Sequence, residues 1–286
     1  MTSNQSQITQ SKLLQSLSDK LPKESFHLTV LESVDSTNTW LQTQSAINKA
    51  NICIANHQTA GRGRFGKQWD SAPNESICFS LRIPTSKSVD QLMGFSLIIA
   101  LAVKAVIAPK ITSDLQLKWP NDILADGKKL CGILIETNTT STESIDLIIG
   151  IGINVFARGA EQYQATSLAE LGLNIVGTSH NSKQNGISHG SYSQTKINQD
   201  GFISELISQV IEYSQRYEMD GFETFRAEWL AQDRWLGSQV EISHSNGASE
   251  QGIYSGLDAV GQVQIEIDGK IKTFNSGEIS FRQVQR

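Results

Sequence analysis

The residues best suited to chemistry lie in one glycine-rich segment, residues 58–69. It contains three glycines, three cations and Trp69. Glycines let backbone N–H groups come close to an anion, and arginine offers a planar, permanently charged fork that matches phosphate oxygens. The indole can stack on a base or pack in the core. The segment therefore predicts a binding site for a phosphorylated small molecule such as an adenylate.

Two widespread phosphate-binding patterns overlap this segment. Residues 61–66 fit G-x-G-x-x-G, and residues 61–67 fit the start of a P-loop, except that Gln68 stands where a P-loop has Ser or Thr. Both patterns need a helix directly after the glycines. Here the turn-rich residues 70–75 lead instead into a strand-like run. The segment is thus predicted to join two strands. It is either an anion-binding loop or a solvated hairpin, and its cations and indole favour the first.

Further polar groups are predicted at strand ends and turns, outside the glycine segment. They are Ser36-Thr37-Asn38, residues 118–122, Lys128-Lys129, and Gly152 with Asn154. If the predicted strands form one sheet, these groups can converge with the glycine segment on one face. That convergence would gather lysines, a carboxylate and bare backbone around one anion.

Each of these groups also has an ordinary structural explanation. Ser36 and Thr37 fit the N-cap of a helix, residues 119–122 fit a plain turn, and a Lys pair is commonly solvated. The Asn-Asp pair in that turn also suits a Mg²⁺–phosphate site. Gly152 interrupts an apolar strand, where close approach of a ligand or another backbone would justify it. No Ser–His–Asp or Cys–His arrangement can be recognised, so no side-chain nucleophile is predicted.

Periodic apolar runs predict the elements that position these groups. Strands are expected at residues 26–34, 52–57, 77–83, 115–119, 130–136 and 145–155, with a tight turn at Asp126-Gly127. Helices are expected from 35–39 to about 47, at 89–108 and at 201–231, plus one within 1–25. Short strands at 240–243, 252–254, 262–267 and 270–274 predict a small C-terminal β-barrel. The polar stretch 174–200 is predicted to be a surface loop.

Composition restricts the class of protein. The 286 residues suffice for one large domain and a small one, and the 38% hydrophobic content is ordinary for a soluble protein. The net charge of −5 gives no general attraction to DNA or RNA. No apolar run approaches 18 residues and no secretory signal is recognised, so neither a membrane span nor export is expected. Three cysteines in apolar runs indicate reduced thiols and a cytoplasmic protein.

Four runs of residues resemble those of the biotin protein ligase (biotin–[acetyl-CoA-carboxylase] ligase) family. They are residues 61–69, 118–122, 129–136 and 150–155, and Asp35-Ser36-Thr37-Asn38 adds a fifth match. The resemblance covers residues 26–286. It implies an α+β fold with a central mixed sheet, helices on one side and an SH3-like C-terminal barrel. The implied division is a polar segment 1–25, a catalytic biotin- and ATP-binding domain 26–235 and the barrel 236–286.

The resemblance also implies a two-step reaction. Biotin's carboxylate attacks the α-phosphate of Mg²⁺-bound ATP to give biotinyl-5′-AMP and pyrophosphate. A lysine amine of a biotin carboxyl carrier protein, from acetyl-CoA carboxylase or a related carboxylase, then attacks this mixed anhydride and releases AMP. Both reactants of the first step are anions, so fixed cations must offset their repulsion, and the intermediate must be kept from water. A mobile Gly/Arg loop that closes over the adenylate would serve both needs.

Roles are carried over by resemblance only to matching positions. The biotin set is Ser36, Thr37, Asn38, Gln58, Arg62, Gly63, Arg64, Lys129, Gly132 and Ile133. The ATP or adenylate set is Arg62, Arg64, Trp69, Lys118, Asn121, Asp122, Gly152 and Asn154. The expected catalytic cations are Arg64, Lys129 and Lys118, and the expected Mg²⁺ ligands are Asp122 and Asn154.

The chain departs from its relatives in two ways. Many relatives have arginine where Phe65 and Lys67 stand, so the charge of the loop is lower here. Some relatives carry an N-terminal winged helix-turn-helix, which residues 1–25 cannot form, so no DNA binding is expected. The rival functions are a lipoate–protein ligase, a biotin-responsive repressor and a nucleotide-binding module without catalysis. The oligomeric state, monomer or homodimer, stays open, as does the identity of the carrier lysine.

Overall fold

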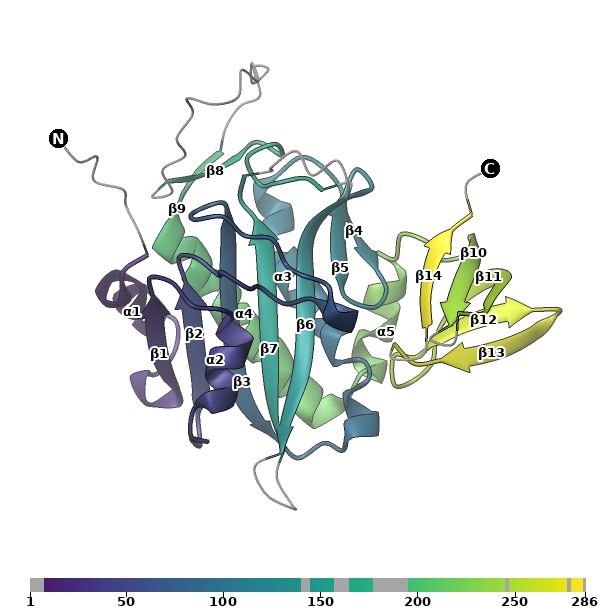
Figure 1. The fold of residues 1–286 in the computed structure, drawn as a ribbon, viewed down its shortest axis with the longest axis horizontal. Helices are drawn as coiled ribbons and strands as arrows, with labels where there is room; N and C mark the ends of the chain where they lie inside the picture. Colours follow the sequence, from purple (N-terminus) through teal and green to yellow (C-terminus); the bar gives the residue numbers. More distant parts are fainter. Residues whose placement is uncertain are drawn as a thin grey trace.

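Seven strands form one mixed sheet at the centre of the molecule (Figure 1). The computed structural model describes residues 8–139, 145–156, 165–176, 195–244, 247–276 and 279–284. The strand order is β1-β2-β3-β7-β6-β5-β4. Only β1 and β2 are parallel within this sheet, and every other neighbouring pair is antiparallel. The strands are β1 (Phe26–Leu31), β2 (Ala50–Ala55), β3 (Ser76–Thr85), β4 (Leu115–Lys118), β5 (Asp122–Ala125), β6 (Lys128–Thr139) and β7 (Ile145–Asn154).

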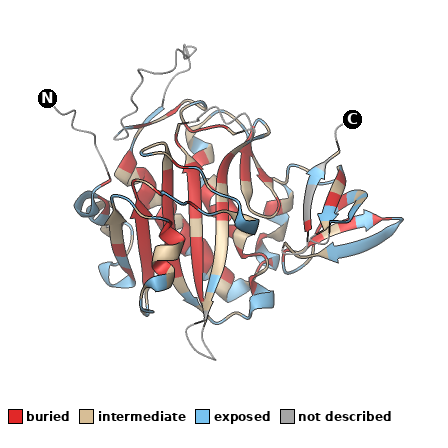
Figure 2. Ribbon diagram, viewed as in Figure 1, coloured by how far each residue is buried: buried red, intermediate tan, exposed pale blue. Residues whose placement is uncertain are grey.

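The long helices cover one face of this sheet, which confirms the predicted architecture. Helix α3 (Phe95–Ile107) lies against the sheet, and α4 (Gln199–Asp220) packs on α3 and on α1 (Gln10–Ser18). Helix α5 (Glu223–Leu230) contacts α3. Among the α-helices of the described residues, the short α2 (Thr37–Thr43) alone lies on the opposite face, where it contacts β2, β3 and β7. Burial on both faces explains why the central strands are almost continuously apolar (Figure 2).

The core lies between the sheet and the long helices. Alternate residues of β3, such as Phe79 and Leu81, point into this core, whereas Leu41, Cys53 and Ile148 form a small separate cluster under α2. The segment Val89–Lys110 is, by length and composition alone, long and apolar enough to cross a membrane. Because 67% of its apolar window is buried in the protein, this stretch packs as a core helix does.

The helix boundaries differ from those predicted. The stretch 89–108 divides into a short 3-10 helix (Val89–Leu92) and α3, and α2 ends at Thr43. The stretch 201–231 is two helices, because Gly221 breaks it with a φ of 73°. The predicted helix within 1–25 exists, and its Leu13 and Leu17 are fully buried. An apolar period locates a helix well but does not show where a glycine stops it.

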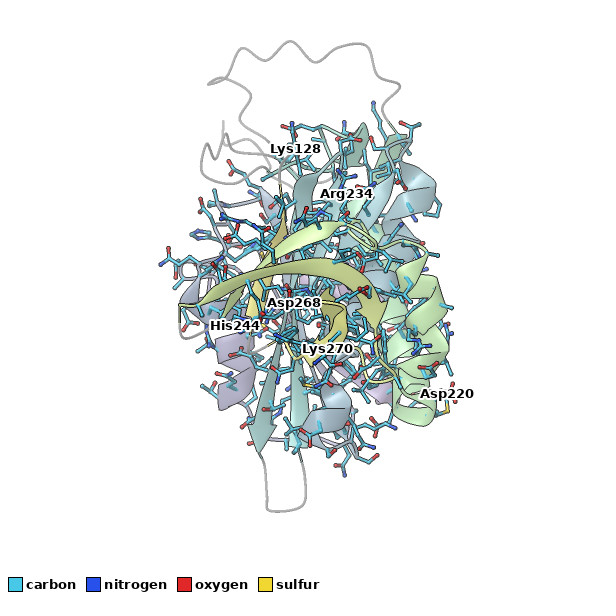
Figure 3. All side chains as sticks on the ribbon, turned by 90° about the vertical axis from the view of Figure 1, so that its right-hand side faces the viewer. Lys128, Asp220, Arg234, His244, Asp268 and Lys270 are labelled. Atoms are coloured by element: carbon cyan, nitrogen blue, oxygen red, sulfur yellow. The ribbon has the colours of Figure 1, made fainter. Side chains whose placement is uncertain are left out.

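A second, five-stranded antiparallel sheet forms the C-terminal part of the chain, in the order β13-β12-β11-β10-β14. Its strands are β10 (Gln239–His244), β11 (Ser249–Leu257), β12 (Val263–Ile267), β13 (Lys270–Phe274) and β14 (Ile279–Gln283). The predicted small C-terminal β-structure is therefore confirmed, with β14 added. Asp268 and Gly269 form the β12–β13 turn, both with positive φ. Figure 3 views this sheet from outside, with Asp268 and Lys270 facing the viewer.

Contacts join the small sheet to the large one. Trp119 is 3% exposed and donates from Nε1 to the backbone oxygen of Gly261 at 3.2 Å. Tyr254 donates to Asp233 Oδ2 at 2.6 Å. The predicted loop 174–200 begins and ends in two short parallel strands, β8 (Leu173–Val176) and β9 (Thr195–Asn198), and residues 177–194 lie outside the described residues.

Candidate functional site

One face of the sheet carries most of the predicted site residues. The register aligns Ser80 of β3 with Gly150 of β7, and Gly152 with Gly132 of β6. Side chains point to alternate faces along a strand. Residues two apart along one strand, and the residues aligned with them on the neighbouring strands, therefore lie on this face. Helix α2 covers one end of the face, and the glycine segment covers the other. The convergence that the sequence could only suppose is thus present.

The N-terminus of α2 is tied to Gln58. The backbone N and Oγ1 of Thr37 both donate to Gln58 Oε1, at 2.8 and 3.0 Å. Gln58 is held in turn by a parallel bridge to Val34. Ser36, which precedes the helix as its N-cap residue, is also buried. Two segments that are 21 residues apart in the chain therefore present their polar groups together.

Two residues outside the predicted set extend this cluster. Ser80, which is fully buried, lies 2.6 Å from Thr37 Oγ1 and donates to Asn38 Oδ1 at 2.5 Å. Asn38 Nδ2 donates to Glu136 Oε2 at 2.8 Å. The hydroxyls of Thr37 and Ser80 take part in three close contacts: one with Gln58 Oε1, one with Asn38 Oδ1 and one with each other. Two hydroxyls carry only two protons, so the cluster contains more hydrogen-bond acceptors than donors.

The glycine segment forms a narrow loop with its own hydrogen bonds. Gly63 N donates to Lys67 O at 2.7 Å, and Trp69 N donates to Gly61 O at 2.9 Å. At the tip, Phe65 and Gly66 have φ values of 54° and 70°. No α-helix follows the glycines, because the chain continues into β3. The segment therefore joins β2 to β3 as predicted, and it is neither a P-loop nor a dinucleotide-binding turn.

The two arginines of the loop point to different partners. Arg62 Nη2 lies 2.8 Å from Glu136 Oε1, so one carboxylate joins the loop to Asn38 of α2. Arg64 Nη1 donates to Asn121 Oδ1 at 3.4 Å, and its Nη2 donates to the backbone oxygen of Ser276, in the segment that follows β13. Burial lowers the pKa of Arg64, although an arginine stays charged at neutral pH.

Trp69 lies directly on the glycines of the sheet. A Cβ added to Gly152 would lie 2.4 Å from Trp69 Cε2, and one added to Gly132 would lie 2.9 Å from Trp69 Cζ3. Gly150 is equally restricted, because a Cβ there would lie 2.4 Å from Asn38 Oδ1. These glycines are thus needed for close approach. The Nε1 of Trp69 is buried and has no hydrogen-bond acceptor among the described residues.

Two lysines from different strands lie near one carboxylate beside the indole, and one of them is ion-paired with it. Lys129 Nζ lies 2.6 Å from Asp122 Oδ1 and 5.7 Å from the centre of the Trp69 ring. Lys118 Nζ lies 4.8 Å from the centre of the Trp235 ring. Burial lowers the pKa of Lys118, the nearby Asp122 raises it, and Lys129 lowers it further. This corner concentrates positive charge where an anion could be bound.

The remaining predicted residues fix the backbone of this corner. Asn121 Nδ2 donates to Ile133 O at 2.7 Å, and Ile133 N donates to Asn121 O at 3.1 Å. Asn154 Nδ2 donates to the backbone oxygens of Lys129, at 3.3 Å, and Thr166, at 3.1 Å. Asn154 therefore holds the strand that carries Lys129.

Ser80, Glu136 and Trp235 are site residues that the sequence prediction missed. Ser80 and Glu136 stand out only as polar residues in the apolar strands β3 and β6, and their partners lie 42 and 98 residues away in the chain. Trp235 reaches Lys118 because the segment after α5 pairs with β4, through an isolated bridge between Leu117 and Asp233. No local sequence pattern predicts that contact.

In the part of the chain that the structure describes, the surface hollows and the possible metal-binding side chains identify no further predicted site residue. A hollow of about 350 Å³ lies against the glycine segment and is lined by residues such as Gln58, Gly61 and Trp69. A hollow of about 460 Å³ lies beside α1 and α4 and includes none of the predicted site residues. Among the described residues, no group of three His, Cys, Asp or Glu side chains could hold a metal ion. All three cysteines are buried and free.

Comparison with known proteins agrees with this geometry. Residues 30–154 match the model of the biotin/lipoate A/B protein ligase family. The chain is 26% identical to the bifunctional ligase/repressor BirA of Escherichia coli, over 90% of this chain and 74% of that protein. It is 28% identical to the biotin–[acetyl-CoA-carboxylase] ligase of Mycobacterium tuberculosis, over 88% of each. The biotin protein ligase of Aquifex aeolicus, solved with biotin and ATP, superposes with a TM-score of 0.68 at 25% identity and covers 90% of this chain and 99% of that one.

Proposed function

We propose that this chain, which belongs through residues 30–154 to the biotin/lipoate A/B protein ligase family, is an ATP-dependent biotin–protein ligase. It joins biotin to AMP and then transfers the biotinyl group to a lysine of a carrier protein. The observation that carries this proposal is the meeting of the arginine loop, the Lys118–Asp122 corner and Lys129 over the glycines of one sheet face.

In the first step, a biotin carboxylate oxygen forms a bond to the α-phosphorus of ATP, and the bond to pyrophosphate breaks. Both partners are negatively charged, so their approach must be offset by fixed positive groups. We assign this role to Lys129 and Lys118, which lie beside the indole of Trp69, and to Arg62 and Arg64 of the loop. Trp69 offers one ring face to the adenylate while the other rests on Gly152.

In the second step, the carrier's lysine amine attacks the biotinyl carbonyl, the bond to the AMP oxygen breaks, and the amine loses a proton. No side-chain nucleophile is required, because the anhydride is already activated. The loop must therefore protect the anhydride from water until the carrier arrives. Arg64 is suited to this task because it contacts both Asn121 and Ser276 of the segment after β13, and so closes the loop onto the rest of the site.

The head group of biotin fits the cluster at the N-terminus of α2. This cluster has open acceptor lone pairs on Asn38 Oδ1 and on the hydroxyls of Thr37 and Ser80, and the ureido ring brings N–H donors. The dithiolane ring of lipoate brings no N–H donor, and it would leave these buried groups less satisfied. The cluster therefore favours biotin over lipoate.

Magnesium is a further part of the proposal. Asp122 supplies a carboxylate oxygen beside Lys118 and Lys129, which suits an ion held mainly by phosphates. When bound, the ion would neutralise phosphate charge. Asn154 commits its Nδ2 to two backbone carbonyls, which leaves its Oδ1 for a cation, so its metal role stays a prediction.

The decisive experiment is transfer of labelled biotin to a biotin carboxyl carrier domain, with and without ATP. We expect labelling only with ATP, together with pyrophosphate release that depends on biotin. Lipoate in place of biotin should release little pyrophosphate, and a mobility-shift assay with DNA should show no specific complex. Pyrophosphate release with lipoate but not with biotin would contradict the proposal. Nucleotide binding without pyrophosphate release would leave the chain a non-catalytic module.

A further inference from the structure

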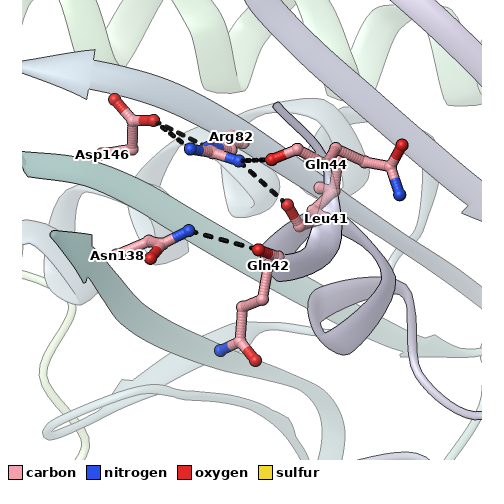
Figure 4. Close-up of polar contacts among 6 residues, drawn as sticks. All are labelled: Leu41, Gln42, Gln44, Arg82, Asn138 and Asp146. Atoms are coloured by element: carbon pink, nitrogen blue, oxygen red, sulfur yellow. Dashed lines mark hydrogen bonds and ion pairs between the residues drawn. The ribbon is translucent and has the colours of Figure 1, made fainter. Parts of the chain in front are cut away.

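A buried ion pair lies under α2, at the end opposite the predicted biotin cluster. The side chains of Arg82 on β3 and Asp146 on β7 are 4% and 8% exposed. Arg82 Nε donates to Asp146 Oδ2 at 2.7 Å, and Arg82 Nη2 lies 2.7 Å from the same oxygen (Figure 4). A buried ion pair is a poor source of stability, because desolvation offsets its attraction. Its other contacts therefore indicate its role.

The remaining contacts of Arg82 go to the end of α2. Its Nη1 donates to Leu41 O at 3.2 Å and to Gln44 O, and Asn138 Nδ2 donates to Gln42 O at 3.4 Å (Figure 4). The last carbonyls of a helix have no partner within the helix, and a cation there interacts favourably with the helix dipole. Three carbonyls at this end of α2 are thus held by side chains of β3 and β6.

The same strand holds the other end of α2. Ser80 lies two residues before Arg82 on the same face of β3, and it contacts Thr37 and Asn38. Helix α2 has seven residues, too few to be stable alone. Its orientation therefore depends on these attachments. A rotation or slide of α2 would move Thr37 away from Gln58.

We propose that Arg82, fixed by Asp146, is a positioning residue for biotin. It sets the register of α2 on the sheet and thereby aims the Ser36–Thr37–Asn38 group at the head of the substrate. The proposal rests on the proposed ligase function for its substrate, but the attachment itself is a property of the substrate-free chain. Arg82 touches neither reactant, so its loss should affect biotin binding far more than ATP binding.

The test measures biotin-dependent pyrophosphate release in Arg82→Lys, Arg82→Met and Asn138→Ala. Lysine keeps the charge but loses the fork that joins Asp146 to two carbonyls. We expect Arg82→Lys to raise the KM for biotin about tenfold and to change the KM for ATP by less than about twofold. Arg82→Met should be worse than Arg82→Lys, and Asn138→Ala should be milder than both.

A matched control exists elsewhere in the chain. Lys110 Nζ donates to Val106 O at 2.8 Å, in the last turn of α3, and pairs with Glu205 at 2.9 Å. This cation also joins a helix carbonyl to a carboxylate, but it contacts none of the site residues. Lys110→Met should leave both KM values unchanged even if it lowers the melting temperature. An equal rise in the KM for biotin in Lys110→Met and Arg82→Lys would overturn the proposal.

A measurement without substrate separates this inference from the proposed function. Amide hydrogen exchange of residues 38–43 should be faster in Arg82→Lys than in the parent, while exchange in α4 stays unchanged. If the parent releases no pyrophosphate but α2 still loosens, the ligase assignment fails and the attachment stands. If the parent is active but α2 exchange and the KM for biotin are unchanged in Arg82→Lys and Asn138→Ala, the positioning role is wrong. These two mild variants keep the test valid if Arg82→Met does not fold.

Discussion

Lys129 Nζ lies 2.6 Å from Asp122 Oδ1, across the β5–β6 hairpin. Glu136, seven residues further along β6, holds Arg62 of the glycine loop at 2.8 Å. Each of these cations is therefore balanced by a carboxylate of the protein. A substrate carboxylate or phosphate has to compete with these ion pairs. The ion pairs hold the cations in position before the substrate arrives.

Lys129→Ala should remove most of the first half-reaction, because the two reacting anions then lack their nearest fixed cation. We expect biotin-dependent pyrophosphate release to fall by about 10²–10³-fold in kcat/KM. Lys128→Ala is the matched control, since Lys128 is the exposed neighbour at the outer end of β6 (Figure 3). Equal activity of the two variants would remove Lys129 from the site.

Arg64→Gly should weaken retention of the adenylate rather than its formation. The variant loses the contacts to Asn121 and Ser276 that hold the loop to the rest of the site. We expect the intermediate to leave the protein at least about tenfold faster. Bystander proteins should then be labelled on unintended lysines. Lys67→Gly, which alters an exposed cation of the same loop, serves as the comparison. Retention as tight as in the parent would show that Arg64 does not hold the intermediate.

Gly152→Ala should impair nucleotide binding. The new methyl group would lie 2.4 Å from Trp69 Cε2, so the indole must leave the sheet surface. We expect the KM for ATP to rise about tenfold or more. Gly201→Ala, where the nearest atom to the new methyl is 3.5 Å away, should be tolerated in α4. Normal ATP kinetics in Gly152→Ala would mean that Trp69 is not part of the nucleotide site.

The buried thiols predict a dependence of stability on alkaline pH. Burial raises the pKa of Cys53 and of Cys78 to about 12, and it raises the pKa of Cys131 as well. The unfolded chain loses these protons near pH 8.5, whereas the folded chain keeps them. Stability is therefore complete below that pH. Above it, the free energy of unfolding should fall by up to about 1.4 kcal/mol per pH unit for each thiol. Denaturant titrations from pH 7 to 10 measure this slope.

The same thiols should be protected from labelling. At pH 8, a thiol-specific reagent should react with fewer than one thiol in the native protein and with all three in denaturant. Rapid labelling of the native chain would contradict the burial of the cysteines.

Local patterns were sufficient to predict the elements and the motif residues of this chain. Alternating and apolar runs located each strand of the large sheet except β5, which lies directly between the predicted turns at 119–122 and Asp126-Gly127. Glycine and Asn-Asp turns marked the places where the chain exposes backbone, so residues 61–69, 118–122 and the pair Lys128-Lys129 could be selected from their types and spacing. Only the family resemblance distinguished Lys129 from Lys128. The end of α4 at Gly221 was missed, because an isolated glycine within an apolar period does not specify a helix end by itself.

Tertiary structure alone decided which of these residues meet. Ser80 joins Thr37 and Asn38 only because the register aligns β3 with β2 and β7, and Arg82 reaches the end of α2 for the same reason. Trp235 reaches Lys118 only because the segment after α5 returns to β4. The sequence determines the chemistry of each side chain and the apolar period of each helix or strand. These depend only on the residue itself and on its near neighbours in the chain. Register and long-range pairing depend on the packing of the whole sheet, so they appear only when the chain is folded.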